Sequence, residues 1–319
     1  MHTPPLSTKQ RGVRAPPLPT SDHVLLAIGL RLLSVGLFAL MNLGIKLAEA
    51  RGAALPEIMF WRQFGATLLV GGLVATGPGI ASLKTRRFGA HVLRTLLGLG
   101  AMALTFQTLT MLPLAEATTI GFSMPIFATV LGALVLHEPT GARRWAAVFA
   151  GFIGVMIVAQ PGGDDFPLVG ALIGLAAAAG TATVSILLRT IGRTEAPLTT
   201  VFWFSSLSLL PLGAAYLFAA KPHEPAVWAI LLGIGVIGGA AQIAMTRSLT
   251  LGPVSTVVPM DYTALLWATV LGALVFDRLP APATWAGAPV IVCSGLYIVW
   301  REHVRRREET RQAIAQGIA

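Results

Sequence analysis

Long apolar segments, separated by short polar connections, follow one another along almost the whole chain. Crossing the hydrocarbon core of a bilayer takes about 20 mostly apolar residues in a helix, and ten segments meet this requirement. They are residues 24–47, 57–77, 91–111, 117–136, 144–160, 168–188, 198–219, 226–247, 254–276 and 283–300. The segments are continuously apolar and lack the alternation of a membrane β-barrel. The pattern predicts an all-α integral membrane protein with ten transmembrane helices.

One segment of the sequence occurs twice, at a spacing of 140 residues. Thr129–Val135 reads T-V-L-G-A-L-V, and Thr269–Val275 reads the same. The register holds without a gap on both sides, where the matched pairs are Pro113 with Pro253 and Trp145 with Trp285. An internal repeat of this kind decides the architecture before any other feature does. It predicts a first repeat over residues 22–160 and a second over residues 161–300, each with five spans.

The odd number of spans in each repeat has a topological consequence. The second repeat enters the membrane from the opposite side, so the two repeats are expected to be inverted relative to each other. Inverted repeats suit alternating access, because exchanging the conformations of the two halves turns an outward-open state into an inward-open one. The sequence has no G-x-x-x-x-G-K-[ST] motif and no loop long enough for a nucleotide domain, which argues against an ATP-driven pump.

The net charge of +9 is distributed as in a membrane protein. With the N-terminus in the cytoplasm, the cytoplasmic ends hold most of the Lys and Arg, in residues 9–14, 84–94, 143–144, 189–193, 247 and 301–311. This bias follows the positive-inside rule and makes a nucleic-acid partner unexpected. Residues 1–21 are predicted to be a disordered cytoplasmic tail. Residues 301–319 are predicted to be a basic cytoplasmic tail that begins as a charged helix.

Glycine and proline mark expected contacts and kinks. Two GxxxG motifs, Gly170 with Gly174 and Gly235 with Gly239, suit close helix packing in lipid. Pro125 and Pro259 are expected to kink spans 4 and 9 near the interface of the repeats, since proline frees a backbone carbonyl.

Residues 113–158, which include P-L-A-E-A-T-T-I-G-F-S-M-P-I-F, resemble the end of an EamA domain of the drug/metabolite transporter superfamily. Residues 253–299, with D-Y-T-A-L-L-W, resemble the same element in a second copy. The resemblance implies ten helices, two five-helix repeats, a central cavity and a secondary carrier or exchanger in a bacterial-type inner membrane. Family members often carry an acid after helices 4 and 9. Glu138 fits this pattern, whereas Asp277 in the second copy is shifted by one residue.

Two charged residues inside the spans are the main candidates for substrate binding, because a charge in the hydrocarbon region is costly. Arg62 in span 2 has Phe204 as its repeat counterpart, and Asp261 in span 9 has Gly121. Arg62 is expected to hold a carboxylate or phosphate, or else to snorkel or pair with Glu57. Asp261 is expected to bind an amine or exchange a proton, or else to be a buried partner of Arg62 or Arg247.

Four further side chains complete the predicted substrate site. Gln107 and Gln242 can hydrogen-bond a polar ligand or another helix, and Tyr262 and Trp267 share span 9 with Asp261. Other polar residues have simpler explanations: Arg31 and Lys46 are expected to snorkel, and Glu116 to interact with the dipole of its own helix. Phe122 is among the aromatic residues that can frame a cavity.

These observations predict a secondary active exporter or exchanger of a small polar or zwitterionic metabolite, with Arg62 and Asp261 binding opposite charges. One alternative is a carrier or flippase of a lipid-linked substrate. The other is a membrane-embedded enzyme, against which the histidines are scattered and form no reactive cluster. The expected partners are a metabolite, the lipid bilayer and protons. No cofactor and no metal are expected, since the single cysteine, Cys293, lies in an apolar span. The chain is expected to act as a monomer.

Overall fold

The computed structural model describes residues 21–135, 141–159, 167–192, 194–251 and 257–315, and the regular structure in these ranges is helical. Its elements are α1 (Ser21–Ala50), α2 (Leu55–Thr76), η1 (Ile80–Leu83), α3 (Phe88–Met111), α4 (Leu114–Gly121), α5 (Met124–Val135), α6 (Ala142–Ala159), α7 (Leu168–Ile191), α8 (Pro197–Ala219), α9 (Pro225–Leu251), η2 (Val258–Thr263), α11 (Ala264–Phe276) and α12 (Pro282–Ala315). Ten spans long and apolar enough to cross a membrane lie within these ranges, so the predicted all-α membrane fold is confirmed.

Two spans are broken, as the prolines predicted. Span 4 consists of α4 and α5, with the interruption at Phe122 and Ser123, and Pro125 is the second residue of α5. Span 9 begins as the 3₁₀ helix η2, which contains Pro259, and continues as α11. Proline has no N–H to donate to the preceding turn, so the regular hydrogen-bond ladder cannot run through either position. The two breaks occupy equivalent places in the two repeats.

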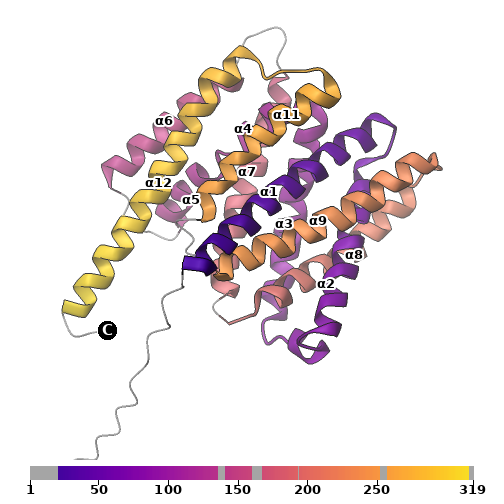
Figure 1. Cartoon of the computed structure of the whole chain (residues 1–319), viewed down its shortest axis with the longest axis horizontal. Helices are drawn as coiled ribbons and strands as arrows, with labels where there is room; N and C mark the ends of the chain where they lie inside the picture. The colour runs from indigo at the N-terminus through magenta and orange to yellow at the C-terminus, as the bar shows by residue number, and fades with distance from the viewer. Residues whose placement is uncertain (1–20, 136–140, 160–166, 193, 252–256, 316–319) are drawn as a thin grey trace, which may run out of the picture.

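The helices of one repeat pack mainly on helices of the other. α1 lies along α9, and α3 lies along α7. The two pairs are equivalent, because α7 is the repeat counterpart of α1 and α9 is that of α3. α2 packs on its own counterpart α8, and α6 on its counterpart α12. Figure 1 shows α1 beside α9 in the middle of the view, with α6 and α12 together at the left. The two repeats are therefore interleaved and form one helical body.

Glycines allow the helices of the two repeats to approach closely. A Cβ atom at Gly65 of α2 would lie 2.5 Å from the backbone of Gly235 in α9, and one at Gly287 of α12 would lie 2.6 Å from the carbonyl of Gly154 in α6. The predicted GxxxG motifs lie in such contacts, because Gly239 faces Ala66 of α2 while Gly170 and Gly174 face α3 and α4. Small residues at these crossings let dispersion contacts form between backbones.

Buried charged side chains connect helix ends. Glu57 accepts a hydrogen bond from the backbone N–H of Ala54, at the start of its own helix. It also accepts from the backbone N–H of Lys221 and from the His223 ring, both before α9. Glu116 accepts hydrogen bonds from the Ala281 N–H and the Thr284 hydroxyl at the start of α12. Its expected interaction with its own helix dipole is thus only part of its role, because its carboxylate caps a helix of the other repeat.

Lys46 does not simply snorkel, contrary to expectation. Its ammonium donates to the carbonyls of Leu109 and Leu112 at 2.7 Å each. These carbonyls lie at the C-terminal end of α3, where the last turn leaves acceptors free and a positive charge is favoured. Lys46 therefore caps α3.

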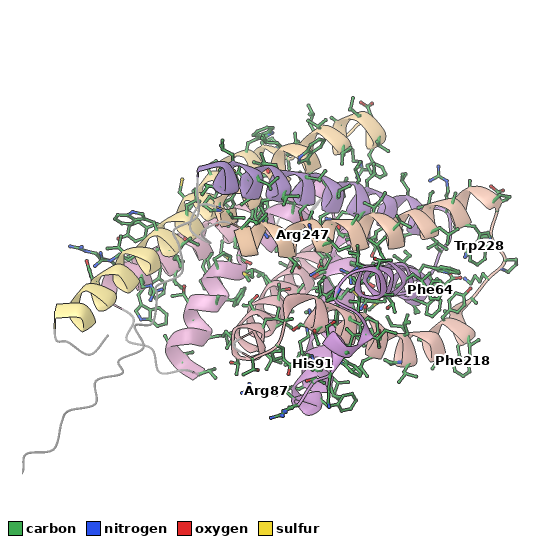
Figure 2. The ribbon with its side chains drawn as sticks, turned by 60° about the horizontal axis from the view of Figure 1, so that its bottom comes forward. Phe64, Arg87, His91, Phe218, Trp228 and Arg247 are labelled. Carbon is green, nitrogen blue, oxygen red and sulfur yellow. The ribbon has the colours of Figure 1, made fainter. Side chains whose placement is uncertain are left out.

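The N-terminal ends of α2 and α9 share an aromatic cluster. The ring centroids of Trp61 and Phe64 are 5.6 Å apart, and those of Trp61 and Trp228 are also 5.6 Å apart. Figure 2 shows Trp228 and Phe218 at one edge of the molecule, well away from His91 at the start of α3. Tryptophan-containing clusters near span ends are typical of the membrane–water interface.

Two predicted features lie largely outside the described residues: the N-terminal tail over 1–21, except for Ser21, and Glu138. The C-terminal segment continues as a helix, since α12 extends to Ala315.

The contact between α2 and α9 predicts a matched pair of glycine variants. Gly65→Ala is expected to lower the free energy of unfolding by about 1–3 kcal/mol, because the added methyl group cannot fit against the Gly235 backbone. Gly72 lies on the same helix, and a Cβ added there has no atom within 4 Å. Gly72→Ala is therefore expected to leave the free energy of unfolding unchanged or to raise it slightly. Thermal unfolding of both variants in one detergent measures the difference, and equal stability of the two would contradict this packing.

Candidate functional site

A cavity of about 240 Å³ lies where α1 and α9 meet the two broken spans. One face of α1 lines it with residues spaced by three to four positions, so that they stack along a single stripe of the helix. α4 contributes a second wall and η2 with α11 a third. The lining residues are Arg31, Ser34, Val35, Phe38, Ala39, Asn42, Leu114, Thr118, Phe122, Met245, Asp261, Ala264 and Ala268.

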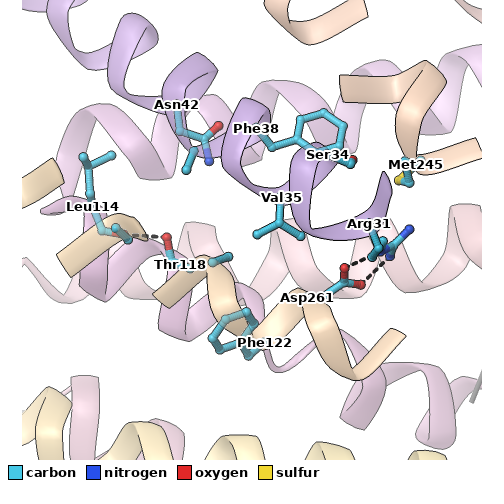
Figure 3. Close-up of a pocket in the computed structure, with 13 residues that line it drawn as sticks. Arg31, Ser34, Val35, Phe38, Asn42, Leu114, Thr118, Phe122, Met245 and Asp261 are labelled. Carbon is cyan, nitrogen blue, oxygen red and sulfur yellow. Dashed lines mark hydrogen bonds and ion pairs between the residues drawn. The ribbon is translucent and has the colours of Figure 1, made fainter. Parts of the chain in front are cut away.

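An ion pair between Arg31 and Asp261 lies at one end of this cavity (Figure 3). The Nε of Arg31 donates to Oδ1 of Asp261 at 2.5 Å, and Nη2 donates to Oδ2. This two-point geometry gives the strongest type of carboxylate contact. The side chain of Arg31 is 8% exposed and that of Asp261 is 38% exposed. The carboxylate therefore faces the cavity, whereas the guanidinium is buried behind it.

The break in span 9 positions Asp261. η2 is wound as a 3₁₀ helix through Pro259, and it packs against α1. The tighter winding of a 3₁₀ helix changes the direction of its side chains relative to a regular α-helix. Asp261 thus faces Arg31 across the boundary between the two repeats.

Sequence reasoning missed the partner in this ion pair. Arg31 was expected to snorkel, and Asp261 to pair, if at all, with Arg62 or Arg247. Arg31 lies only ten residues after the first residue of α1, and its position near a span end concealed its burial. The spacing of Arg31, Ser34, Phe38 and Asn42 on one helix face was the available signal.

The remaining polar groups of the cavity are uncharged. The Ser34 hydroxyl donates to the carbonyl of Ala241 at 2.9 Å, and the Thr118 hydroxyl donates to that of Leu114 at 2.7 Å. Both hydroxyl oxygens can still accept a hydrogen bond from a ligand. Within the described part of the chain, the Asn42 amide has no side-chain partner. Phe38 and Phe122 add two aromatic surfaces.

Tyr262 lies behind the cavity wall. Its ring meets that of Phe122 with centroids 4.9 Å apart in an edge-to-face arrangement. Phe122 and Tyr262 are separated by 140 residues, the spacing of the repeat, so equivalent residues of the two repeats touch each other. The Tyr262 hydroxyl points toward Gly295 of α12. Its position supports Phe122, which itself lines the cavity.

Trp267, Gln107 and Gln242 were also predicted for the substrate site, but they do not line this cavity. Trp267 is 43% exposed and packs its indole against Gly36 of α1. The Gln107 amide donates to the Thr110 hydroxyl at 3.3 Å within α3. Gln242 is on α9, where its backbone carbonyl accepts from Thr246. None of the three is among the residues that line the cavity.

Arg62 and Asp261 are not brought together, because the partner of Asp261 is Arg31. Arg62 is buried in α2, with its Cγ facing Gly238 of α9. Its guanidinium donates from Nη1 to the Oε1 of Gln63. The alternative pairing with Glu57 is wrong, since that carboxylate binds His223 and backbone groups.

A second cavity, of about 380 Å³, adjoins the first. It is lined by the end of α1, the α3–α4 connection and the end of α11, and includes Lys46, Glu116 and Arg278. Leu114 and Ala268 line both cavities. These two residues thus lie between the cavity that contains the Arg31–Asp261 pair and the second, charged cavity at the helix ends, here called the vestibule.

Comparison with known proteins agrees with this arrangement. The profile of the EamA-like transporter family matches residues 20–160 and, a second time, residues 168–300. A crystal structure of another protein superposes with a TM-score of 0.58 at 19% identity, covering 90% of this chain and 99% of that one. At this identity the superposition supports the fold alone.

Several relatives are transporters. The chain is 34% identical over 233 residues to a riboflavin transporter of Vibrio cholerae, covering 71% of this chain and 77% of the relative. It is 27% identical over 271 residues to a riboflavin transporter of Brucella anthropi, covering 82% and 94% of the two chains. It is 26% identical over 261 residues to an S-adenosylmethionine uptake transporter of Rickettsia conorii, covering 80% and 87%.

The ion pair predicts unequal costs for its two single variants. Asp261→Asn is expected to lower the free energy of unfolding by about 3 kcal/mol, because it leaves Arg31 buried without a counter-charge. Arg31→Gln is expected to cost about 1 kcal/mol, since the more exposed Asp261 carboxylate can be hydrated. Unfolding in detergent measures both.

The double variant Arg31→Gln/Asp261→Asn is the control for this pair. Its loss is expected to be smaller than the sum of the single losses, as for residues in direct contact. Additive losses, or a larger loss for Arg31→Gln alone, would count against the pairing.

Proposed function

Because the chain belongs to the EamA-like transporter family, we propose that it is a secondary active transporter of an uncharged polar metabolite with an aromatic ring system, of the riboflavin type. It is a transporter and not an enzyme. The substrate is proposed to bind in the cavity between α1, α4 and the broken span 9, and to cross by alternating access.

The internal charge balance of the cavity carries this proposal. Arg31 and Asp261 are the charged residues of the lining, and they neutralise each other in a two-point ion pair. A zwitterionic or ionic substrate would have to break this pair and replace its contacts. An uncharged substrate leaves it intact, which favours a neutral metabolite over the zwitterion considered from the sequence.

The uncharged groups of the cavity suit such a ligand. Ligand pockets combine apolar walls with a few placed polar groups that fix orientation. Phe38 and Phe122 can stack on a flat ring system, while Asn42 both donates and accepts hydrogen bonds. Riboflavin has a flat ring system and a polyhydroxylated chain, and it is named for two of the relatives. S-adenosylmethionine, named for a third, carries charges that this cavity would have to bind at Asp261.

The two broken spans support alternating access. Substrate sites of carriers with inverted repeats typically lie beside discontinuous helices at the repeat interface. Here α4–α5 and η2–α11 flank the cavity from equivalent places in the two repeats, and Phe122 meets Tyr262 between them. In this proposal Leu114 and Ala268, which separate the cavity from the vestibule, form the constriction on that side.

The proposed membrane is the bacterial plasma membrane, with both termini in the cytoplasm. Its support is the positive charge of residues 1–21 and 301–319 together with an even number of spans. The vestibule that contains Lys46 and Arg278 then faces the outside.

Riboflavin flux tests the substrate. The purified protein in proteoliposomes is expected to take up riboflavin. Phe122→Ala is expected to lower kcat/KM about tenfold, since an aromatic contact contributes on the order of 1 kcal/mol. Phe149→Ala is the matched control, because Phe149 is 65% exposed on α6 and lines none of the cavities described above.

Parallel assays with S-adenosylmethionine identify the competing outcome. Flux of S-adenosylmethionine without flux of riboflavin would contradict an uncharged substrate. Equal losses for Phe122→Ala and Phe149→Ala would contradict the proposed binding site.

Reporter fusions test the orientation. A fluorescent protein fused after Ala319 is expected to fluoresce, and alkaline phosphatase at the same point is expected to be inactive, as for a cytoplasmic terminus. Both reporters inserted at residues 162–163, between spans 5 and 6, are expected to give the reverse pattern, and the opposite result at either site would invert the topology.

A further inference from the structure

α6 and α12 form an outlying pair of helices, apart from the cavity that contains Arg31 and Asp261. They are repeat counterparts that pack mainly on each other, at the left of the view in Figure 1. Two contacts fix their relative position. A Cβ atom at Gly287 would lie 2.6 Å from the Gly154 carbonyl, and the Ser294 hydroxyl donates to the carbonyl of Ala147. The two helices therefore run antiparallel, with the start of α6 beside the last membrane-embedded turns of α12.

A groove of about 630 Å³ runs between these two helices. From α6 it is lined by Arg143, Ala146 and Ala150, and from α12 by Pro289, Cys293 and Tyr297. The side chains of Ala146, Pro289 and Cys293 are exposed, so the groove opens to the outside of the helical body, where the bilayer lies. It shares no lining residue with the proposed substrate cavity or with the vestibule.

The groove starts at the membrane surface and extends into the hydrocarbon. Arg143 is the second residue of α6, which forms span 5, so it lies at the end of that span. Ala150 follows it by seven residues, and Pro289 precedes Tyr297 by eight. At a rise of 1.5 Å per residue, the groove is about 10–12 Å long. One leaflet contributes about half of the 30 Å hydrocarbon core. The groove thus follows about two-thirds of a leaflet, the depth of the upper part of an acyl chain.

Aromatic side chains lie at the outer end of the groove. The ring centroid of Tyr297 is 5.7 Å from that of Trp300, which is 56% exposed. Trp145 follows Arg143 by two residues on α6. Tryptophan and tyrosine are enriched at the level of the lipid headgroups. Arg143 is exposed at this level, and no described acidic side chain forms an ion pair with it.

We propose that this groove is a binding site for one anionic phospholipid. Its phosphate binds Arg143, and one of its acyl chains lies along the small side chains between α6 and α12. The planar fork of arginine matches a phosphate group, and basic pockets between transmembrane helices are typical binding sites for anionic headgroups. Because α6 belongs to the first repeat and α12 to the second, the lipid contacts both repeats at once. The site does not depend on the substrate of the proposed function.

Charge favours a lipid over a second copy of the chain as the occupant. A two-fold dimer brings the same surface of both protomers together. With its axis along the membrane normal, a dimer through this groove places both copies of Arg143 at the same depth near the axis, where they repel each other. An anionic headgroup instead supplies the counter-charge that the described protein residues do not.

Native mass spectrometry of the full-length protein tests the headgroup contact. The protein in detergent is titrated separately with phosphatidylglycerol and with phosphatidylcholine of the same acyl chains. We expect one phosphatidylglycerol to bind about fivefold more tightly than phosphatidylcholine, in line with the attraction of a single arginine near the surface for an anionic lipid. Arg143→Gln is expected to remove this preference. Arg86→Gln, which removes another exposed arginine, is the matched control and is expected to keep it.

Ala146→Leu tests the contact with the acyl chain. The larger side chain fills the groove while Arg143 stays in place. It is expected to weaken the binding of phosphatidylglycerol about tenfold, as for the loss of contact with about two methylene groups. Ala176→Leu, the same change at an exposed position of α7, is the matched control and is expected to bind like the native protein.

Cys293 provides a test that does not depend on the folding of a groove variant. It is the single cysteine of the sequence and is exposed in the groove wall. N-Ethylmaleimide therefore modifies this one position on the folded native protein and fills the groove. The modified protein is expected to bind phosphatidylglycerol as weakly as Ala146→Leu does, whereas Cys293→Ser treated in the same way is expected to keep the native affinity.

Three results would overturn the proposal. One is equal binding of the two lipids by the native protein, and another is a preference for phosphatidylglycerol that persists both in Arg143→Gln and after modification of Cys293. The third is a dimer without bound lipid that dissociates in Ala146→Leu, because a second copy would then be the occupant. All measurements are made without riboflavin, so a failure of riboflavin transport leaves this result unaffected, and the reverse also holds.

Discussion

Close backbone contact between the two repeats is the constraint on which the rest of the structure depends. Lipid offers helices little hydrophobic reason to associate, so dispersion contacts and hydrogen bonds must hold them together. The structure places these contacts between repeats, as at Gly65 with Gly235 and at Gly154 with Gly287. Neither repeat has an extensive interface of its own, since its long helices pack mainly on helices of the other. The two repeats are therefore expected to be stable only together.

The cavity is a consequence of this interleaving. Where the broken spans meet α1 and α9, regular helix packing is interrupted and a space remains between the repeats. The equivalent residues Phe122 and Tyr262 meet beside it, so the local shape is nearly symmetric. The chemistry is asymmetric, because Asp261 has Gly121 as its counterpart. The frame is therefore nearly symmetric, whereas the ion pair is not, because the first repeat supplies Arg31 and the second supplies Asp261.

The buried arginines show how much the surroundings of a charge decide its role. Arg31 has a carboxylate in two-point contact, so the protein itself supplies its counter-charge. Arg62 and Arg94 have an amide and an aromatic ring instead, which leave positive charge uncompensated. A buried charge with a counter-charge costs less free energy than a buried charge without one. The same residue type thus forms an ion pair in one place and contacts only uncharged side chains in another.

The sequence by itself determined the number of spans, the two repeats and the family, because bilayer thickness and a seven-residue identity at a fixed spacing are local or linear signals. It also located the breaks at Pro125 and Pro259, since proline acts on its own helix turn. Only the tertiary structure decided which charges meet. Arg31 and Asp261 are 230 residues apart, and no periodicity along one helix reveals the rotation of another. For the same reason Trp267 was expected in the cavity and packs against Gly36 instead, while Arg94, counted among the topological charges, proved to be buried beside Phe204.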